Sequence, residues 1–205
     1  DIQAAVAADA QACNTIERCY EYTFGAAAIQ ADMVSPPSGT QYPLCGEIPV
    51  AILIKNVKAV TVTDLIAQID LPTNGATPVL GSFEASYPNG GDLSGATPFY
   101  SIPNPTINGS QLIYTEDNDF SNAIHSDGFP GVTSDLDSNQ IVIRFLMKTD
   151  CDEFVSGSQI GLEAFANDPC SPEPLESGYI LSDGVIIQGA NPADFAQILT
   201  TSKPE

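Results

Sequence analysis

The stretch QIVIRFLMK, residues 140–148, decides the fold class of this chain. Along it one set of side chains alternates with another: Ile141, Ile143, Phe145 and Met147 against Val142, Arg144, Leu146 and Lys148. A period of two places each set on its own face of a β-strand, and β-branched residues favour that conformation. The stretch is therefore predicted to be a long strand with one face in a hydrophobic core.

Similar runs recur on both sides of this strand, and turn signals rich in Gly, Pro and Asn separate them. The further predicted strands are residues 48–55, 57–66, 79–86, 99–102, 110–115, 158–166, 179–181 and 185–188. Many short strands at such spacing predict an all-β antiparallel sandwich. One short helix is predicted after Asn191, because Pro192 and Asp194 are typical of the first turn of a helix.

The N-terminal segment differs from the rest, which suggests a division into an extension at residues 1–44 and a sandwich module at residues 45–205. Tyr20, Tyr22 and Phe24 share one face of a predicted strand, and the run Ser35-Pro36-Pro37-Ser38-Gly39 then breaks regular structure. These three aromatic residues are the candidate assembly residues, because such an arm can complete a neighbouring subunit's sheet as a donated strand.

The charge of the chain is strongly acidic: 26 Asp and Glu face 6 Lys and Arg in 205 residues, a formal net charge of −20. That field repels phosphate backbones and anionic lipid, so the composition argues against nucleic-acid binding. No apolar run approaches the roughly 20 residues of a membrane span, which argues against membrane insertion. With 43% hydrophobic residues the chain is expected to be globular.

Five cysteines without a CxxC spacing favour disulfides in an oxidising exterior over zinc ligation. We predict that Cys151 pairs with Cys170, across a strand-like segment, and that Cys13 pairs with Cys19. Cys45 is an alternative partner for either member of the second pair, because connectivity does not follow from sequence.

The segments between Cys45 and Cys170 carry a family resemblance. CGEIPVAILIKN is followed by VKAVTVTDLIAQIDLP, GSFEASYP, TSDLDSNQIVIRFLMKTDC and SGSQIGLEAFANDPC. This layout resembles the Ig-like conserved repeat domain of large bacterial surface proteins, such as the giant adhesins and gliding-motility filaments of Bacteroidetes. The resemblance implies an Ig-like sandwich in an extracellular adhesive or filament-forming module, with a late cysteine pair that staples the final hairpin.

Two acidic loops suggest calcium, which prefers six to eight oxygen ligands. The candidate ligands are Glu116, Asp117, Asp119, Asp127, Asp135, Asp137 and Asn139. The Asp-x-Asp-x-Asn run at residues 135–139 resembles the start of an EF-hand loop but departs from it, because Gln140 stands where that loop has glycine. The same residue types also simply form turns.

Catalytic motifs are weak in this sequence. His125 is the only histidine, and no GxSxG elbow accompanies it. A sugar-binding platform would have to use tyrosines such as Tyr87, Tyr100 or Tyr114, because the chain has no tryptophan. Asn108 begins an Asn-Gly-Ser glycosylation sequon.

Together these features predict a non-catalytic extracellular module that acts by protein–protein assembly and surface attachment. The expected partners are copies of itself or neighbouring modules, and glycans or host surfaces. A carbohydrate-binding module and, less well supported, a secreted hydrolase are the alternatives.

Overall fold

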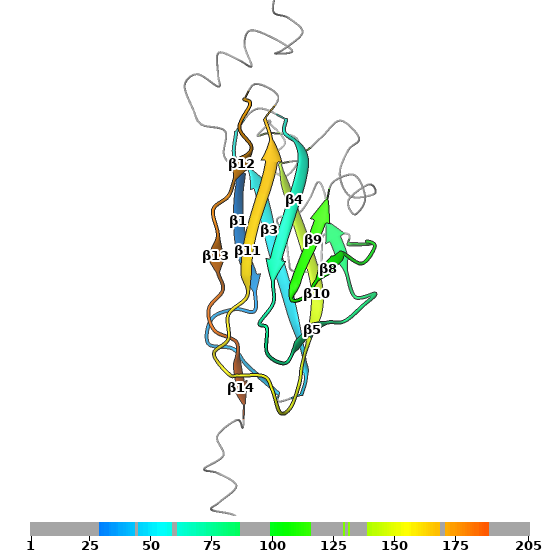
Figure 1. The fold of residues 1–205 in the computed structure, drawn as a ribbon, viewed down its shortest axis with the longest axis vertical. Coiled ribbons are helices and arrows are strands. Elements are labelled where there is room, and N and C mark those ends of the chain that lie inside the picture. Colours follow the sequence, from blue (N-terminus) through cyan, green and yellow to red (C-terminus); the bar gives the residue numbers. More distant parts are fainter. Residues whose placement is uncertain are drawn as a thin grey trace, which may run out of the picture.

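A computed structural model describes residues 29–43, 45–58, 61–86, 99–115, 129, 131, 139–168 and 171–188 of the chain. These residues form two β-sheets that pack face to face, which we call sheet I and sheet II. Figure 1 shows β11, β4 and β9 of sheet II crossing in front of β3 and β10 of sheet I. Within the described residues every regular element is a strand.

Sheet I has the order β1-β3-β10-β6-β7, and β5 also pairs with β10. Its strands are β1 Ile29–Ser35, β3 Glu47–Asn56, β5 Ala76–Pro78, β6 Glu84–Ser86, β7 Tyr100–Ser101 and β10 Gln140–Thr149. The stretch that was predicted as a long strand is β10, at the centre of this sheet. It pairs with β3 from Gln140 opposite Lys55 to Lys148 opposite Glu47.

Sheet II has the order β12-β11-β4-β9-β8, and β13 also pairs with β11. Its strands are β4 Thr63–Asp70, β8 Thr106–Asn108, β9 Gln111–Thr115, β11 Gly161–Asn167, β12 Leu175–Glu176 and β13 Ile180–Leu181. A separate parallel pair joins β2 Gln41–Pro43 to β14 Ile186–Gln188. The strand predicted at residues 57–66 is displaced along the chain, because β4 begins at Thr63 and runs on to Asp70.

The strand order is that of an immunoglobulin-like sandwich. The path β1-β3-β10-β6 corresponds to strands A, B, E and D, and β12/β13-β11-β4-β9 corresponds to G, F, C and C′. The chain departs from the variable-domain pattern in one respect, because the β8–β9 hairpin follows β6 along the chain instead of preceding it. The predicted all-β, Ig-like antiparallel sandwich is therefore confirmed.

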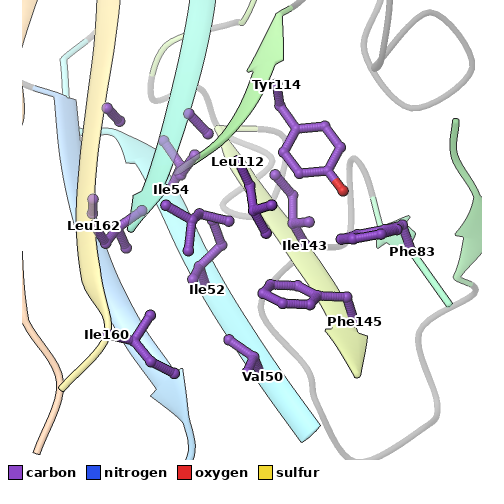
Figure 2. Close-up of a cluster of buried hydrophobic side chains, with 14 of the residues drawn as sticks. Val50, Ile52, Ile54, Phe83, Leu112, Tyr114, Ile143, Phe145, Ile160 and Leu162 are labelled. Atoms are coloured by element: carbon purple, nitrogen blue, oxygen red, sulfur yellow. The ribbon is translucent and has the colours of Figure 1, made fainter. Parts of the chain in front are cut away.

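The hydrophobic core lies between the two sheets. Inward side chains of β3 and β10 meet those of β9 and β11 in Figure 2, and among them Ile52, Ile143 and Leu112 have no exposed surface. Phe83 reaches the same space from the irregular segment between β5 and β6. Its ring stacks on Phe145 at 5.0 Å between centroids and meets Tyr114 edge-on at 5.8 Å. These contacts fix the distance between the sheets on this side of the sandwich.

The structure corrects the domain boundary that we expected after residue 44. β1 pairs along β3, and Ile29, Ala31 and Tyr42 belong to the same core cluster as β3 and β10. The reason is physical: alternate side chains of β1 are apolar and fill the core beside β11. The sandwich thus begins by residue 29, and residues 1–28, with the predicted assembly residues Tyr20, Tyr22 and Phe24, lie outside the described residues. So does the helix predicted after Asn191.

The predicted disulfide between Cys151 and Cys170 is wrong, because Cys151 is bonded to Cys45. Antiparallel pairing of β3 with β10 brings Cys45, two residues before β3, beside Cys151, two residues after β10, and their Cα atoms are 4.7 Å apart. β11 instead runs away from this end, from Gly161 opposite Asp70 towards Asn167 opposite Thr63. Cys13, Cys19 and Cys170 lie outside the described residues.

Candidate binding surface

The outer face of sheet I carries charges that are paired within the sheet. Lys55 lies 3.5 Å from Asp32 on β1, and Arg144 lies 2.6 Å from Glu84 on β6. Lys148 stands directly opposite Glu47 in the β3–β10 register. The guanidinium of Arg144 also lies 3.6 Å from the centre of the Phe99 ring, a cation–π arrangement. Two of the cations on this face thus form ion pairs within the sheet, and Lys148 has an acidic residue opposite it.

The outer face of sheet II carries apolar side chains in its middle. In β4 the residues Leu65, Ala67 and Ile69 are fully buried, so the alternation turns Ile66 outward. The same reasoning turns Phe165 of β11 and Ile113 of β9 outward, and all three are half-buried. Ile66 stands directly opposite Phe165. Ile113 stands opposite Gln68, the next outward residue of β4. The three side chains thus form one apolar patch across three neighbouring strands.

Acidic residues surround this patch without a basic residue among them. Asp64 and Asp70 lie on β4, Glu163 lies on β11, and Glu176 of the neighbouring β12 stands opposite Phe165. None of the strands of sheet II contains Lys, Arg or His. All described Lys and Arg residues lie in β3, in β10 or just after β3: Lys55, Lys58, Arg144 and Lys148. The negative charge of sheet II is therefore uncompensated within the sheet.

At one end of this face Tyr179 reaches across β11. It lies over Gly161, where any Cβ would overlap the Tyr179 hydroxyl, and it donates a hydrogen bond to Asp70 of β4. Gln111 of β9 also donates to this carboxylate, with Nε2 3.0 Å from Oδ1. Desolvation of the hydroxyl, and next the hydrogen bond to Asp70, raise the pKa of Tyr179. The neutral phenol therefore favours the folded state below pH 10, and this contribution is lost as the pH rises through the raised pKa.

The residues predicted as calcium ligands are almost all outside the described residues: Glu116, Asp117, Asp119, Asp127, Asp135 and Asp137. Asn139 is described and is 7% exposed. Its Nδ2 donates to the carbonyl of Asn56 at 2.7 Å, and its buried Oδ1 accepts no hydrogen bond. Within the described ranges no three His, Cys, Asp or Glu side chains gather as a metal site would require. Calcium binding thus stays a prediction.

A calcium site in these loops would stabilise the folded chain by mass action. At a free calcium concentration one hundred times the dissociation constant, the gain is about 2.7 kcal/mol. We expect the melting temperature to rise with millimolar calcium and to return to its original value with chelator. Replacement of Asp135 and Asp137 by Asn should abolish that rise. A melting curve that is identical in calcium and in chelator contradicts the prediction.

The other predicted sites have mixed outcomes. Tyr114 is fully buried, so it offers no sugar-binding platform, whereas Tyr100 is 46% exposed on β7. Tyr87 and His125 lie outside the described residues. Asn108 ends β8 and stands opposite Gln111 across the Gly109–Ser110 turn, in an exposed position. Its glycosylation remains untested. In the described part of the chain no helix is long and apolar enough to cross a membrane.

The comparisons with known proteins identify structures but no family. No family model matches the chain, and no curated protein matches it. A variant of the major pilin subunit BcpA of Bacillus cereus matches 78% of this chain and 40% of its own length, at 11% identity and a TM-score of 0.46. The third ScaC cohesin of Acetivibrio cellulolyticus, solved with the ScaB dockerin, matches 78% of this chain and 96% of its own, at 13% identity and a TM-score of 0.44. The collagen-binding domain of a Staphylococcus aureus adhesin matches 78% of this chain and 96% of its own, at 11% identity and a TM-score of 0.40.

At these identities the likeness concerns the fold alone. The chain spans less than half the length of the pilins it matches. The resemblance to the conserved repeat domain of Bacteroidetes surface proteins stays a prediction. What this chain binds has to be inferred from its own residues.

Proposed function

We propose that this chain is a non-catalytic extracellular module of a bacterial surface or filament protein, which transmits tension along its long axis and attaches by protein–protein contact. The observation that supports this most directly is the path of the chain. β1 begins at Ile29, opposite Asn56, at one end of the sandwich. β14 ends at Gln188, opposite Pro43, next to the Cys45–Cys151 bond at the other end. Figure 1 shows β1 at the upper part of the molecule and β14 at its lower end.

Two features of the fold suit a module under tension. A pull between Ile29 and Gln188 loads the β1–β3 ladder parallel to its strands, so that its hydrogen bonds share the force instead of breaking one after another. The Cys45–Cys151 bond, with a sequence separation of 106, also closes a segment that includes every strand of sheet I except β1 and the strands β4, β8 and β9 of sheet II. A disulfide of this kind is typical of proteins in an oxidising exterior.

Single-molecule stretching tests the proposal. We expect the module to unfold at a clearly higher force when it is held at residues 29 and 188 than when it is held at Gly109 and residue 188. The second geometry pulls on the β8–β9 turn and peels β9 from β4 one hydrogen bond at a time. Equal unfolding forces in the two geometries would contradict a role in transmitting tension.

The same experiment has an internal control in the length that unfolding releases. With the disulfide intact, the segment from Cys45 to Cys151, with a sequence separation of 106, cannot extend. Reduction should therefore add roughly 350–380 Å to the released length, at about 3.3–3.6 Å for each residue. A reduced chain that releases no extra length would show that the bond does not protect the module.

Assembly through the N-terminal arm is part of the same proposal. Residues 1–28 precede β1, and Tyr20, Tyr22 and Phe24 are the side chains that a neighbouring sheet would accept. The partners in this proposal are copies of the chain itself, neighbouring modules or host surfaces. Of the tyrosines predicted as a sugar-binding platform, Tyr114 is buried and Tyr100 is exposed, and a single exposed ring gives the carbohydrate-binding alternative little support.

A further inference from the structure

The outer face of sheet II combines two properties that do not occur together on the outer face of sheet I. Its apolar patch, formed by Ile66, Ile113 and Phe165, is half-buried. Sheet I also turns half-buried apolar residues outward, Leu53 and Leu146, but Lys55, Arg144 and Lys148 stand among them. A partly accessible apolar patch across three strands is the usual centre of a protein contact surface, with a polar rim around it.

The charges around the patch indicate which kind of partner protein can bind there. Asp64, Asp70, Glu163 and Glu176 lie on the strands of sheet II, whose residues include no Lys, Arg or His. The cations of sheet I face their own acids, as Lys55 faces Asp32 and Arg144 faces Glu84. An acidic rim without internal compensation attracts a basic surface and repels an acidic one.

We propose that the outer face of sheet II is a docking surface for a partner protein that presents apolar side chains between Lys and Arg residues. The proposal deepens the proposed function and rests on its protein-binding part. The partner is not a second copy of this chain meeting the same face, because acidic rims would then oppose each other and the chain carries a net charge of −20.

Some of the acidic groups are held in position, which makes the rim a defined surface. Asp64 accepts a hydrogen bond from Asn167 Nδ2 at 2.8 Å, so β4 and β11 are joined at one end of the patch. Asp70 is held at the other end by Tyr179 and by Gln111, whose Nε2 lies 3.0 Å away. Both carboxylates can still accept further hydrogen bonds from Lys or Arg. Fixed acids on either side of an apolar centre impose an orientation on the partner.

The test uses a synthetic amphipathic peptide rich in Lys and Leu, with a second peptide in which Ser replaces every Leu. We expect the Lys–Leu peptide to bind the whole chain and to shift the amide resonances of β4, β9 and β11, with an affinity that falls as salt rises. The Lys–Ser peptide should bind much more weakly. Glu163→Lys should lower the affinity for the Lys–Leu peptide at least about tenfold.

The matched control is Glu47→Lys on the exposed end of sheet I, which changes the net charge by the same amount and should lower the affinity less than about threefold. Equal losses for the two variants, or resonance shifts confined to sheet I, would overturn the proposal and show attraction to the overall charge only. A dimer in sedimentation that Glu163→Lys disrupts would overturn it as well, since the occupant would be a second copy.

Failure of this inference is separable from failure of the proposed function. Glu163→Lys lies outside the β1–β3 ladder and the disulfide, so it should leave the forced unfolding of the chain unchanged. Loss of peptide binding together with unchanged unfolding force supports the docking surface. A changed unfolding force or a lowered melting temperature would mean that Glu163 supports the fold. In that case Phe165→Ser is the test variant, and it must lose peptide binding while its melting temperature stays normal.

Discussion

A chain in which Ser replaces both Cys45 and Cys151 is expected to melt roughly 10–20 °C below the oxidised wild type. The bond closes a segment with a sequence separation of 106, and in the chain-entropy model a loop of that size contributes about 4.7 kcal/mol by restricting the unfolded chain. The bond also lies where β3 begins and β10 ends, so its loss frees the central pair of sheet I at one end. Thermal melting with and without reductant measures the effect.

The control for this prediction is Cys170→Ser. Because Cys151 is bonded to Cys45, this variant should leave that bond in place in a peptide map of the oxidised chain. Reductant should then still lower the melting temperature of the variant. A map that joins Cys151 to any other cysteine, or a double Ser variant that melts like the oxidised wild type, would contradict the assignment.

The pairing of Cys151 with Cys45 could not be predicted from the sequence. Cys151 and Cys170 are close along the chain, and a strand-like segment separates them, which favoured a hairpin between them. Which strands are neighbours is decided by the packing of the whole sandwich, and β10 lies beside β3, not beside β11. Cys45 precedes β3 by two residues, so the correct pair follows once the neighbour of β10 is known. The sequence contains no local signal for that neighbour.

The two central strands of sheet I were predictable because each carries its own alternation, whereas β1 was not predicted. The residues of β10 and β3 follow the predicted ranges closely, since one face of each is continuously apolar. The run at 79–86 is different, and only Glu84–Ser86 is a strand. Val79 donates to Leu146 at 2.8 Å and Ser82 Oγ accepts from Leu146 N at 2.9 Å, so this segment binds β10 irregularly while Phe83 enters the core. Tertiary contacts here outweigh the local pattern.

The apolar patch on sheet II is only weakly indicated by the sequence. In the run Leu65-Ile66-Ala67 three apolar residues are consecutive, so alternation alone does not say which face Ile66 takes. The buried residues Ala67 and Ile69 decide it only once the strand is known to run to Asp70. The uneven division of cations between the sheets was not predictable either, because it depends on which strands pair.

The second large effect is expected at Phe83, where an aromatic side chain from an irregular segment joins the two sheets. The ring is 1% exposed and contacts Phe145 of sheet I and Tyr114 of sheet II. Aromatic pairs of this geometry add to the free energy gained from burial alone. The neighbouring aromatic residue Tyr100, on β7, is 46% exposed and provides a matched position with little burial.

Phe83→Ala is therefore expected to lower the free energy of unfolding by about 3–5 kcal/mol, the usual range for removing a buried aromatic ring. Tyr100→Ala should lower it by less than about 1 kcal/mol. Urea unfolding followed by tyrosine fluorescence gives both values. The surrounding side chains belong to strands of two different sheets, so they have little freedom to close the cavity that the alanine leaves. A loss at Phe83 as small as that at Tyr100 would mean that the sheets do not need this ring between them, and that the β5–β6 segment is not part of the core.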